Sequence, residues 1–370
     1  MKKVKAFLKR KNIEVSLRRY GVDAMGAMAQ GLFCSLLVGT ILNTLGTYCH
    51  VPFLSATVVT VHGTFQGAPY EVAYTVGGLA MAMVGPAMAV AIGYALRCPP
   101  MVLFSLVPVG WATNVLGGAG GPLAVLFVAI AAAEIGKMVS GETKIDLLVT
   151  PIVTILAGTG LAWLIAAPIG RAAAWTGEMI ELATSLRPFW MGILVSVGMG
   201  VLLTLPVSSA AICAAMGLTG LGGGAAVAGC CAQMVGFAVL SFRENRWGGL
   251  VSQGLGTSML QMGNIVKNPR IWLPACAAGA VTGPLATCVF RLEMNGAPIN
   301  SGMGTCGLCG PIGVVSGWAA DVTAGLRGPV TGFDWLGLAL ICFVLPGVLA
   351  WLFGLICRRF GWIREGDLKL

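Results

Sequence analysis

The chain has 370 residues, of which 57% are hydrophobic and 10% are charged, and its mean hydropathy is +0.87. Soluble domains carry about 25% charged residues, so the composition excludes a soluble globular protein and indicates an integral membrane protein. The formal net charge of +9 gathers at the two chain ends, which argues against nucleic-acid binding. The 54 glycines and 18 prolines predict close helix contacts and broken helices.

The N-terminal residues 1–20 mix lysines and arginines with apolar side chains. This pattern predicts a cytoplasmic, amphipathic basic helix on the inner leaflet of the membrane; the alternative is a flexible solvated tail. More cations follow the last apolar segment, at Arg358, Arg359, Arg364 and Lys369. By the positive-inside rule, both termini are therefore expected in the cytoplasm, with an even number of spans and no cleavable signal peptide.

Apolar segments recur along most of the chain, and a transmembrane helix needs about 20 such residues. The clear candidates are residues 22–45, 72–96, 145–167, 188–205, 222–242 and 333–357. Further segments are shorter or are interrupted by glycine and proline, at residues 100–116, 121–139, 271–291 and 306–320. We therefore expect an all-α polytopic membrane protein with about 8–10 transmembrane helices and re-entrant hairpin loops.

Residues 170–186 are too polar to span a membrane but are amphipathic. Trp175 and Met179 share one helical face, and Glu178 and Glu181 share another. This segment is expected to form an interfacial helix that links two halves of the protein.

Two stretches are polar and glycine-rich although both lie next to apolar runs: PVSSAAICAAMGLTGLGGG at 206–224 and RENRWGGLVSQGLGTSMLQMGNIVKNPR at 243–270. Irregular backbone at membrane depth is tolerated only where it is buried in protein or lines a watery cavity. Part of 252–268 is therefore expected to line a cavity; the alternative is a long cytoplasmic loop.

A polar solute in a membrane cavity needs amides and hydroxyls, which bind it without the desolvation cost of a charge. The predicted substrate-binding residues are Gln261, Asn264, Thr257, Ser258, Gln253, Ser208, Ser209, Asn300, Ser301 and Thr305. For each of them the alternative is a helix-to-helix hydrogen bond. No nucleophile–base constellation is visible, so no catalytic residue, metal or cofactor is predicted.

A few ionisable side chains lie inside or near apolar segments. Glu134 and Lys137 are either an intramembrane functional pair or a surface pair at a helix end. His50 and His62 lie in a segment expected to face the membrane exterior, where a lone histidine is usually a packing residue.

The stretch SGMGTCGLCGP, residues 301–311, contains the pair Cys306-x-x-Cys309. Such a pair is half of a structural zinc site, but no second pair and no histidine lies near it in sequence. A redox pair would need solvent access and a helix N-terminus. The glycines favour a third interpretation, a tight re-entrant turn that exposes backbone N–H groups near the substrate site.

The order of these pieces resembles the membrane subunit, enzyme IIC, of sugar phosphotransferase systems, especially the fructose and mannitol branch. The matching stretches include GPAMAVAIGYALRCPP, WMGILVSVGMGVLLTLPVSSAAICAAMG and VSQGLGTSMLQMGNIVKNPRIWLPACAAGAVTGPL. The resemblance covers residues 20–320. SFRENRWGG and GMGTCGLCGPIG look closest to a stand-alone, enzyme IIC-like group related to a clostridial toxin regulator.

The resemblance implies an elevator architecture in which a substrate-binding half, residues 187–325, moves against a scaffold, residues 21–186. Residues 326–370 would supply the last transmembrane helix and a cytoplasmic tail. The implied protein is a homodimeric permease of the bacterial cell membrane for a sugar, polyol or related solute. Its implied partners are that solute, membrane lipid and a separate phosphocarrier subunit, without which it would perform no phosphorylation.

One departure from the classical sugar subunits matters. The family's signature loop carries a glutamate that faces the substrate, whereas the stretch from Gly256 to Asn264 has no carboxylate, and Gln261 is the nearest analogue. The resemblance to the toxin-regulator group implies an alternative function, an enzyme IIC-like membrane sensor that binds a ligand without transporting it.

Overall fold

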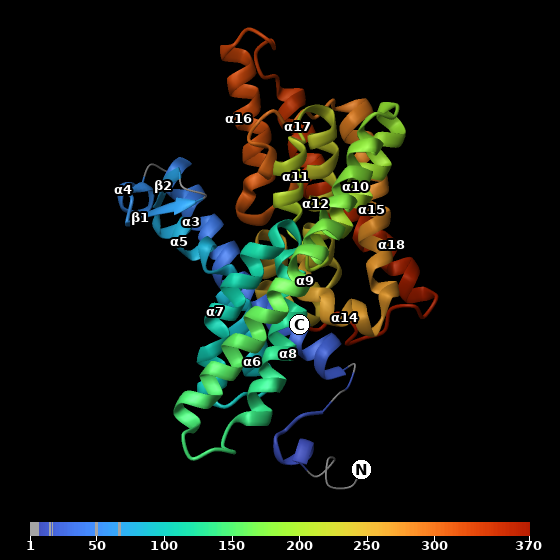
Figure 1. The fold of residues 1–370 in the computed structure, drawn as a ribbon. Coiled ribbons are helices and arrows are strands. Elements are labelled where there is room, and N and C mark those ends of the chain that lie inside the picture. The colour runs from blue at the N-terminus through green and yellow to red at the C-terminus, as the bar shows by residue number, and fades with distance from the viewer. Residues whose placement is uncertain (1–6, 15, 17, 49–50, 66–67) are drawn as a thin grey trace.

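The computed structural model describes residues 7–14, 16, 18–48, 51–65 and 68–370. Its helices form two groups, and the long α9 of the first group reaches the second (Figure 1). The first group contains α2 (Ala24–Leu32), α6 (Val84–Ala95), α7 (Pro100–Gly117), α8 (Gly121–Val139) and α9 (Asp146–Thr184). The second contains α10 (Pro188–Thr204), α12 (Gly220–Leu240), α15 (Leu273–Pro284) and α18 (Leu345–Arg359).

Shorter elements connect and flank these groups. The helices among them are α3 (Val38–Tyr48), α4 (Pro52–Ser55), α5 (Val76–Ala82), α11 (Ser209–Met216), α13 (Phe242–Val251), α14 (Met262–Lys267), α16 (Cys309–Thr323) and α17 (Gly332–Ala339). The strands are β1 (Val59–Phe65) and β2 (Ala68–Tyr74). The all-α polytopic membrane fold that the sequence predicts is thus confirmed, apart from this small hairpin.

Six described helical stretches are long and apolar enough to cross a membrane, or seven with α5 and α6 as one span bent by 54°. One of them, 40 residues long, contains both α7 and α8. These two helices pack against each other because the chain reverses at Gly118, whose φ is +50°. Counting them separately and adding the 17-residue α10 gives nine described stretches, which lies within the expected 8–10 but is not the even number that two cytoplasmic termini require. The expected span 306–320 is not among them, since α16 has only 15 residues.

Helix α9 joins the expected span 145–167 and the expected interfacial segment 170–186 into one helix of 39 residues. At 1.5 Å per residue it is about 58 Å long, well beyond the hydrocarbon core of about 30 Å. Gly177 and Ile180 of its last turns are buried against the second group, whereas Trp175 and Met179 are exposed. The amphipathic pattern therefore belongs to the end of a long helix that extends from the first group to the second.

The basic N-terminal segment is not one continuous helix over its described residues. Residues 7–10 are helical, and the chain turns at Asn12, whose φ is +52°, a conformation that asparagine tolerates. The Lys11 ammonium and the Arg10 guanidinium lie 2.5 and 2.6 Å from the Glu142 carboxylate. The segment thus docks on the loop after α8.

This docking is expected to depend on pH. The pKa of Glu142 lies below its usual value, chiefly because Lys11 donates a hydrogen bond to it and then because Arg10 is close. Ionised Glu142 therefore supports docking above its ordinary pKa, about 4.3, and loses that effect as pH falls through the lowered pKa. Spin labels at Lys9→Cys and Lys144→Cys should report a longer, broader distance in acid. Glu142→Gln should show that distance at neutral pH as well; a persisting pH response would contradict the assignment.

A buried ion pair lies inside the first group, where Lys137 Nζ is 2.7 Å from a Glu134 oxygen and the two side chains are 1% and 13% exposed. Lys137 also donates to the Leu96 and Asn12 carbonyls, at 3.2 and 3.1 Å, and Tyr20 donates to Glu134 at 3.1 Å. The pair is therefore a structural tie between α8, the α6–α7 loop and the N-terminal segment, rather than a surface pair.

A β-hairpin that the sequence analysis did not anticipate projects from the side of the first group (Figure 1). β1 and β2 pair in antiparallel register, with Val61 opposite Val72. His62 lies opposite Glu71 at 3.9 Å, and both are exposed; His50 is outside the described residues. Only the last three residues of β2, 72–74, fall within the apolar run 72–96 that was expected to span the membrane.

Candidate functional site

The polar stretch 243–268 is folded into the second group rather than extended as an exposed loop. After α13 come a π-helical turn (Ser252–Gly256), an extended residue, Thr257, a 3-10 turn (Ser258–Gln261) and α14. The side chains of Gln253, Ser258 and Gln261 are completely buried.

A cavity of about 180 Å³ lies where this stretch meets the first group. From the first group it is lined by Leu32, Leu36, Met81, Val84, Asn114, Gly118 and Pro122. From the second group it is lined by Leu203, Val207–Ala210, Gly256, Thr257, Met259, Gly302, Met303 and Cys306. The cavity therefore lies between the two helix groups, and no described charged side chain lines it.

Four polar side chains reach this cavity. Ser208 Oγ caps α11 by accepting from Ala211 N at 3.2 Å, and Thr257 Oγ1 caps the 3-10 turn by accepting from Met259 N at 3.2 Å. These hydroxyls keep their protons free to donate.

The other two polar side chains offer the complementary groups. Ser209 Oγ donates to the Gly302 carbonyl at 2.7 Å and keeps acceptor capacity. The half-buried Asn114 makes no hydrogen bond within the described chain and so presents both donors and an acceptor. Together the four can bind a neutral polar molecule with several hydroxyl groups.

The glycine-rich stretch 301–311 forms a tight turn. Gly304 and Gly307 have φ values of +51° and +52°, which favour glycine. A Cβ on Gly302 would lie 2.5 Å from the Ser209 carbonyl oxygen, so only glycine permits this contact at the cavity wall. Cys306 and Cys309 are both buried, and no described group of histidine, cysteine and acidic residues can hold a metal ion.

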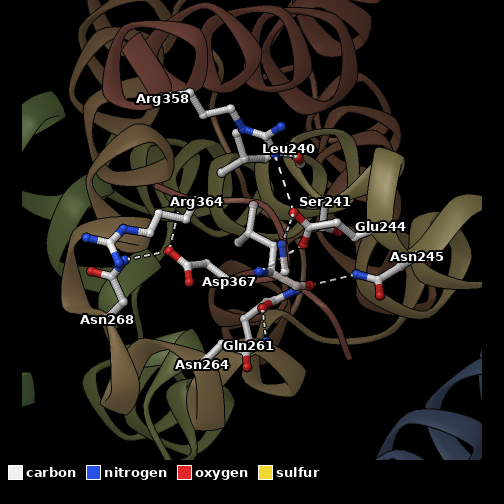
Figure 2. A network of polar contacts seen from close by, with 12 residues as sticks. Leu240, Ser241, Glu244, Asn245, Gln261, Asn264, Asn268, Arg358, Arg364 and Asp367 are labelled. Carbon is white, nitrogen blue, oxygen red and sulfur yellow. Dashed lines mark hydrogen bonds and ion pairs between the residues drawn. The ribbon is translucent and has the colours of Figure 1, made fainter. Parts of the chain in front are cut away.

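Gln261 and Asn264, the first two of the predicted substrate-binding residues, face the C-terminal tail instead of the cavity (Figure 2). Gln261 Nε2 donates to the Leu368 carbonyl at 2.9 Å, and Asn264 Nδ2 donates to the Lys369 carbonyl at 2.9 Å. Gln261 also donates to Gln253 Oε1 at 3.0 Å. These side chains thus bind main-chain groups of the protein's own last residues.

The tail reaches this position because α18 ends in a glycine cap. Gly361 has a φ of +70°, and its N–H and that of Trp362 donate to the carbonyls of Arg358 and Cys357. The chain then runs back beneath the second group. Leu368 is fully buried there, and its N–H donates to Glu244 Oε2 at 2.9 Å.

The remaining predicted site residues tie parts of the second group together. Ser258 Oγ lies 2.8 Å from Thr204 Oγ1, and Ser301 Oγ donates to the Leu218 carbonyl at 2.7 Å. Thr305 donates to the Gly254 carbonyl and so joins the glycine-rich turn to the polar stretch. The Asn300 side chain makes no hydrogen bond within the described chain and lies against Gly313.

Of the predicted residues, Ser208, Ser209 and Thr257 thus line the cavity together. Asn114 is not among the predicted residues, although a single amide inside the apolar run 100–116 was an available signal.

The fold and the cavity define a polytopic membrane protein with a small cavity between two helical groups, whose mostly apolar lining carries four uncharged polar side chains. Residues 22–370 match the family model described as "Phosphotransferase system, EIIC". The chain therefore belongs to the EIIC family, the membrane components that work with other proteins of the phosphotransferase system. Comparison with curated proteins and with solved structures gives no match.

Proposed function

We propose that the protein is a permease for a small, uncharged polar solute such as a sugar or polyol, and that the cavity beside Asn114 is its solute site. The neutral, amide- and hydroxyl-bearing lining carries this proposal. Charged walls would favour an ionic solute, whereas four neutral hydrogen-bonding side chains suit hydroxyl groups. The cavity volume of about 180 Å³ is below the range of about 300–1,000 Å³ that is usual for drug-sized ligands, which suits a small solute.

The proposed mechanism is an elevator motion of the second group against the first. The cavity takes its walls from both groups, so a relative movement would open it to one side of the membrane. At this boundary Ser208 N donates to the Ala119 carbonyl at 2.9 Å, a contact that such a movement must break. The proposal extends to a homodimer with both termini in the cytoplasm of a bacterial cell and a separate phosphocarrier subunit.

Asn114→Ala is the first test of this assignment. Because it removes one or two hydrogen bonds to the solute, we expect the apparent dissociation constant to rise by about 3–10-fold. Thermal-shift titration against a panel of sugars and polyols would measure it. Asn300→Ala is the matched control, since Asn300 does not line the cavity, and it should leave binding unchanged. Loss of binding in Asn300→Ala but not in Asn114→Ala would place the site elsewhere.

A ligand-binding sensor is the second candidate function. It is favoured by the contact between the Gln261 amide, the analogue of the family's substrate-facing glutamate, and the protein's own tail. With the tail in that position, ligand binding near Gln261 would change the position of the tail. The tail is a segment that another protein can bind. Proteoliposome flux separates the two candidates: binding without uptake, with or without phosphocarrier proteins, would favour the sensor.

A further inference from the structure

A second cavity of about 280 Å³ lies outside the proposed solute site, where two transmembrane helices end. Its walls come from the last residues of α12, from α13 and from the last turns of α18. Its apolar wall includes Val239, Phe242, Trp247, Trp351 and Leu355.

The aromatic side chains of this cavity are placed as in a membrane-interface belt. Trp247 is 71% exposed and packs edge-on against Phe242, with ring centroids 5.4 Å apart. Trp351 is 46% exposed and lies two turns before the cationic end of α18. Tryptophan is enriched at this level of membrane proteins because its ring is apolar and its N–H is polar.

Two guanidinium groups line the same cavity. Arg243 makes no ion pair or hydrogen bond within the described chain. Arg358 donates to the Leu240 carbonyl at 3.1 Å and lies 3.9 Å from Glu244 (Figure 2). Glu244 in turn accepts from the N–H groups of Gly366 and Leu368, so its carboxylate is held toward the tail. The exposed Arg246 and Arg359 add further positive charge nearby.

The apolar wall continues onto the exposed surface of α18. Val348, Leu352 and Ile356 on this helix are each between 43% and 51% exposed, as expected for side chains that contact acyl chains. An apolar surface that leads to a cationic cavity at the end of a span matches a phospholipid, whose acyl chains and phosphate are joined. A soluble anion would use the cations alone.

We propose that this cavity is a binding site for an anionic phospholipid. The phosphate of the headgroup would contact Arg243 and Arg358, because a guanidinium presents paired donors to phosphate oxygens. The acyl chains would lie along Trp351 and Leu355. The site is independent of the solute cavity.

Native mass spectrometry of the full-length protein with phosphatidylglycerol or phosphatidylcholine tests the proposal. Bound phosphatidylglycerol is expected to exceed bound phosphatidylcholine. Arg243→Gln should lower phosphatidylglycerol affinity by about fivefold, because one interfacial arginine contributes about 1 kcal/mol. Arg243→Lys should restore part of it. Arg359→Gln is the matched control: it removes the same charge from a residue that does not line the cavity, and should leave the affinity nearly unchanged.

Each other outcome would overturn the proposal. Equal losses in Arg243→Gln and Arg359→Gln would show diffuse attraction instead of a site. Displacement of the lipid by millimolar inorganic phosphate would identify a soluble anion as the ligand. Dissociation of a dimer by Arg243→Gln, with the lipid count unchanged, would show that a second copy of the chain covers this surface. The melting temperatures of the variants are the folding control. They should stay unchanged, because the exposed Arg243 is not needed for folding.

Discussion

Deleting residues 363–370 is expected to lower the melting temperature by several degrees and to loosen the polar stretch 252–268. Ile363 and Leu368 are 3% and 0% exposed, and burial of two such side chains contributes about 3–6 kcal/mol. The deletion also removes hydrogen-bond acceptors of the buried amides of Gln261 and Asn264. Each buried group left unpaired lowers the free energy of unfolding by about 1–3 kcal/mol. Thermal unfolding in detergent measures the first effect, and hydrogen exchange of residues 252–268 measures the second.

Two point variants separate the parts of this prediction. Leu368→Ala should reproduce much of the loss, about 2–5 kcal/mol, because its side chain is fully buried. Lys369→Ala should have little effect, since Lys369 is exposed and only its carbonyl binds Asn264. A tail deletion that left both measurements unchanged would show that the contacts in Figure 2 do not form in solution.

The tail deletion also has an expected effect on solute binding. Thr257 and Met259 line the cavity and belong to the stretch that the tail holds in place. A loosened wall should weaken binding, because ordering it again costs conformational entropy. If affinity rises instead, the tail competes with the solute for Gln261, which would support a sensing role.

Gly229→Val is expected to prevent correct folding of the second group. Gly229 of α12 faces α10 so closely that a Cβ atom would lie 1.8 Å from the Ser196 carbonyl oxygen. The two helices must then separate, which disrupts a contact between spans whose packing lacks a strong hydrophobic driving force. Overpacking in a tight core costs about 1–3 kcal/mol or more, and here the obstacle is backbone, which cannot turn away.

Fluorescence-detected size exclusion would show Gly229→Val as aggregated or poorly expressed protein. Gly160→Ala and Gly160→Val provide the matched controls in α9, since a Cβ there would meet no atom within 4 Å beyond the backbone of its own helix. Gly160→Ala should even be slightly stabilising, because alanine favours a helix by about 1 kcal/mol over glycine. Normal folding of Gly229→Val would disprove the packing of α10 on α12.

The sequence by itself determined the class of this protein and the position of most of its spans. Transfer into a membrane depends on the hydrophobicity of about 20 consecutive residues, which can be read locally. For this reason residues 222–242, 271–291 and 333–357 correspond closely to the stretches Gly220–Leu240, Pro269–Val289 and Gly332–Arg359. The same argument indicated that part of the polar stretch 252–268 lines a cavity, as Gly256, Thr257 and Met259 do.

Only the tertiary structure decided which polar groups meet. Asn114 and Thr257 are far apart in the sequence but line one cavity, because two helix groups pack together around it. The Gln261 amide binds the tail because a glycine cap turns the chain back after α18, and no local pattern near Gln261 encodes that return. Hydrogen-bonding capacity belongs to a residue, whereas its partner depends on packing between distant segments.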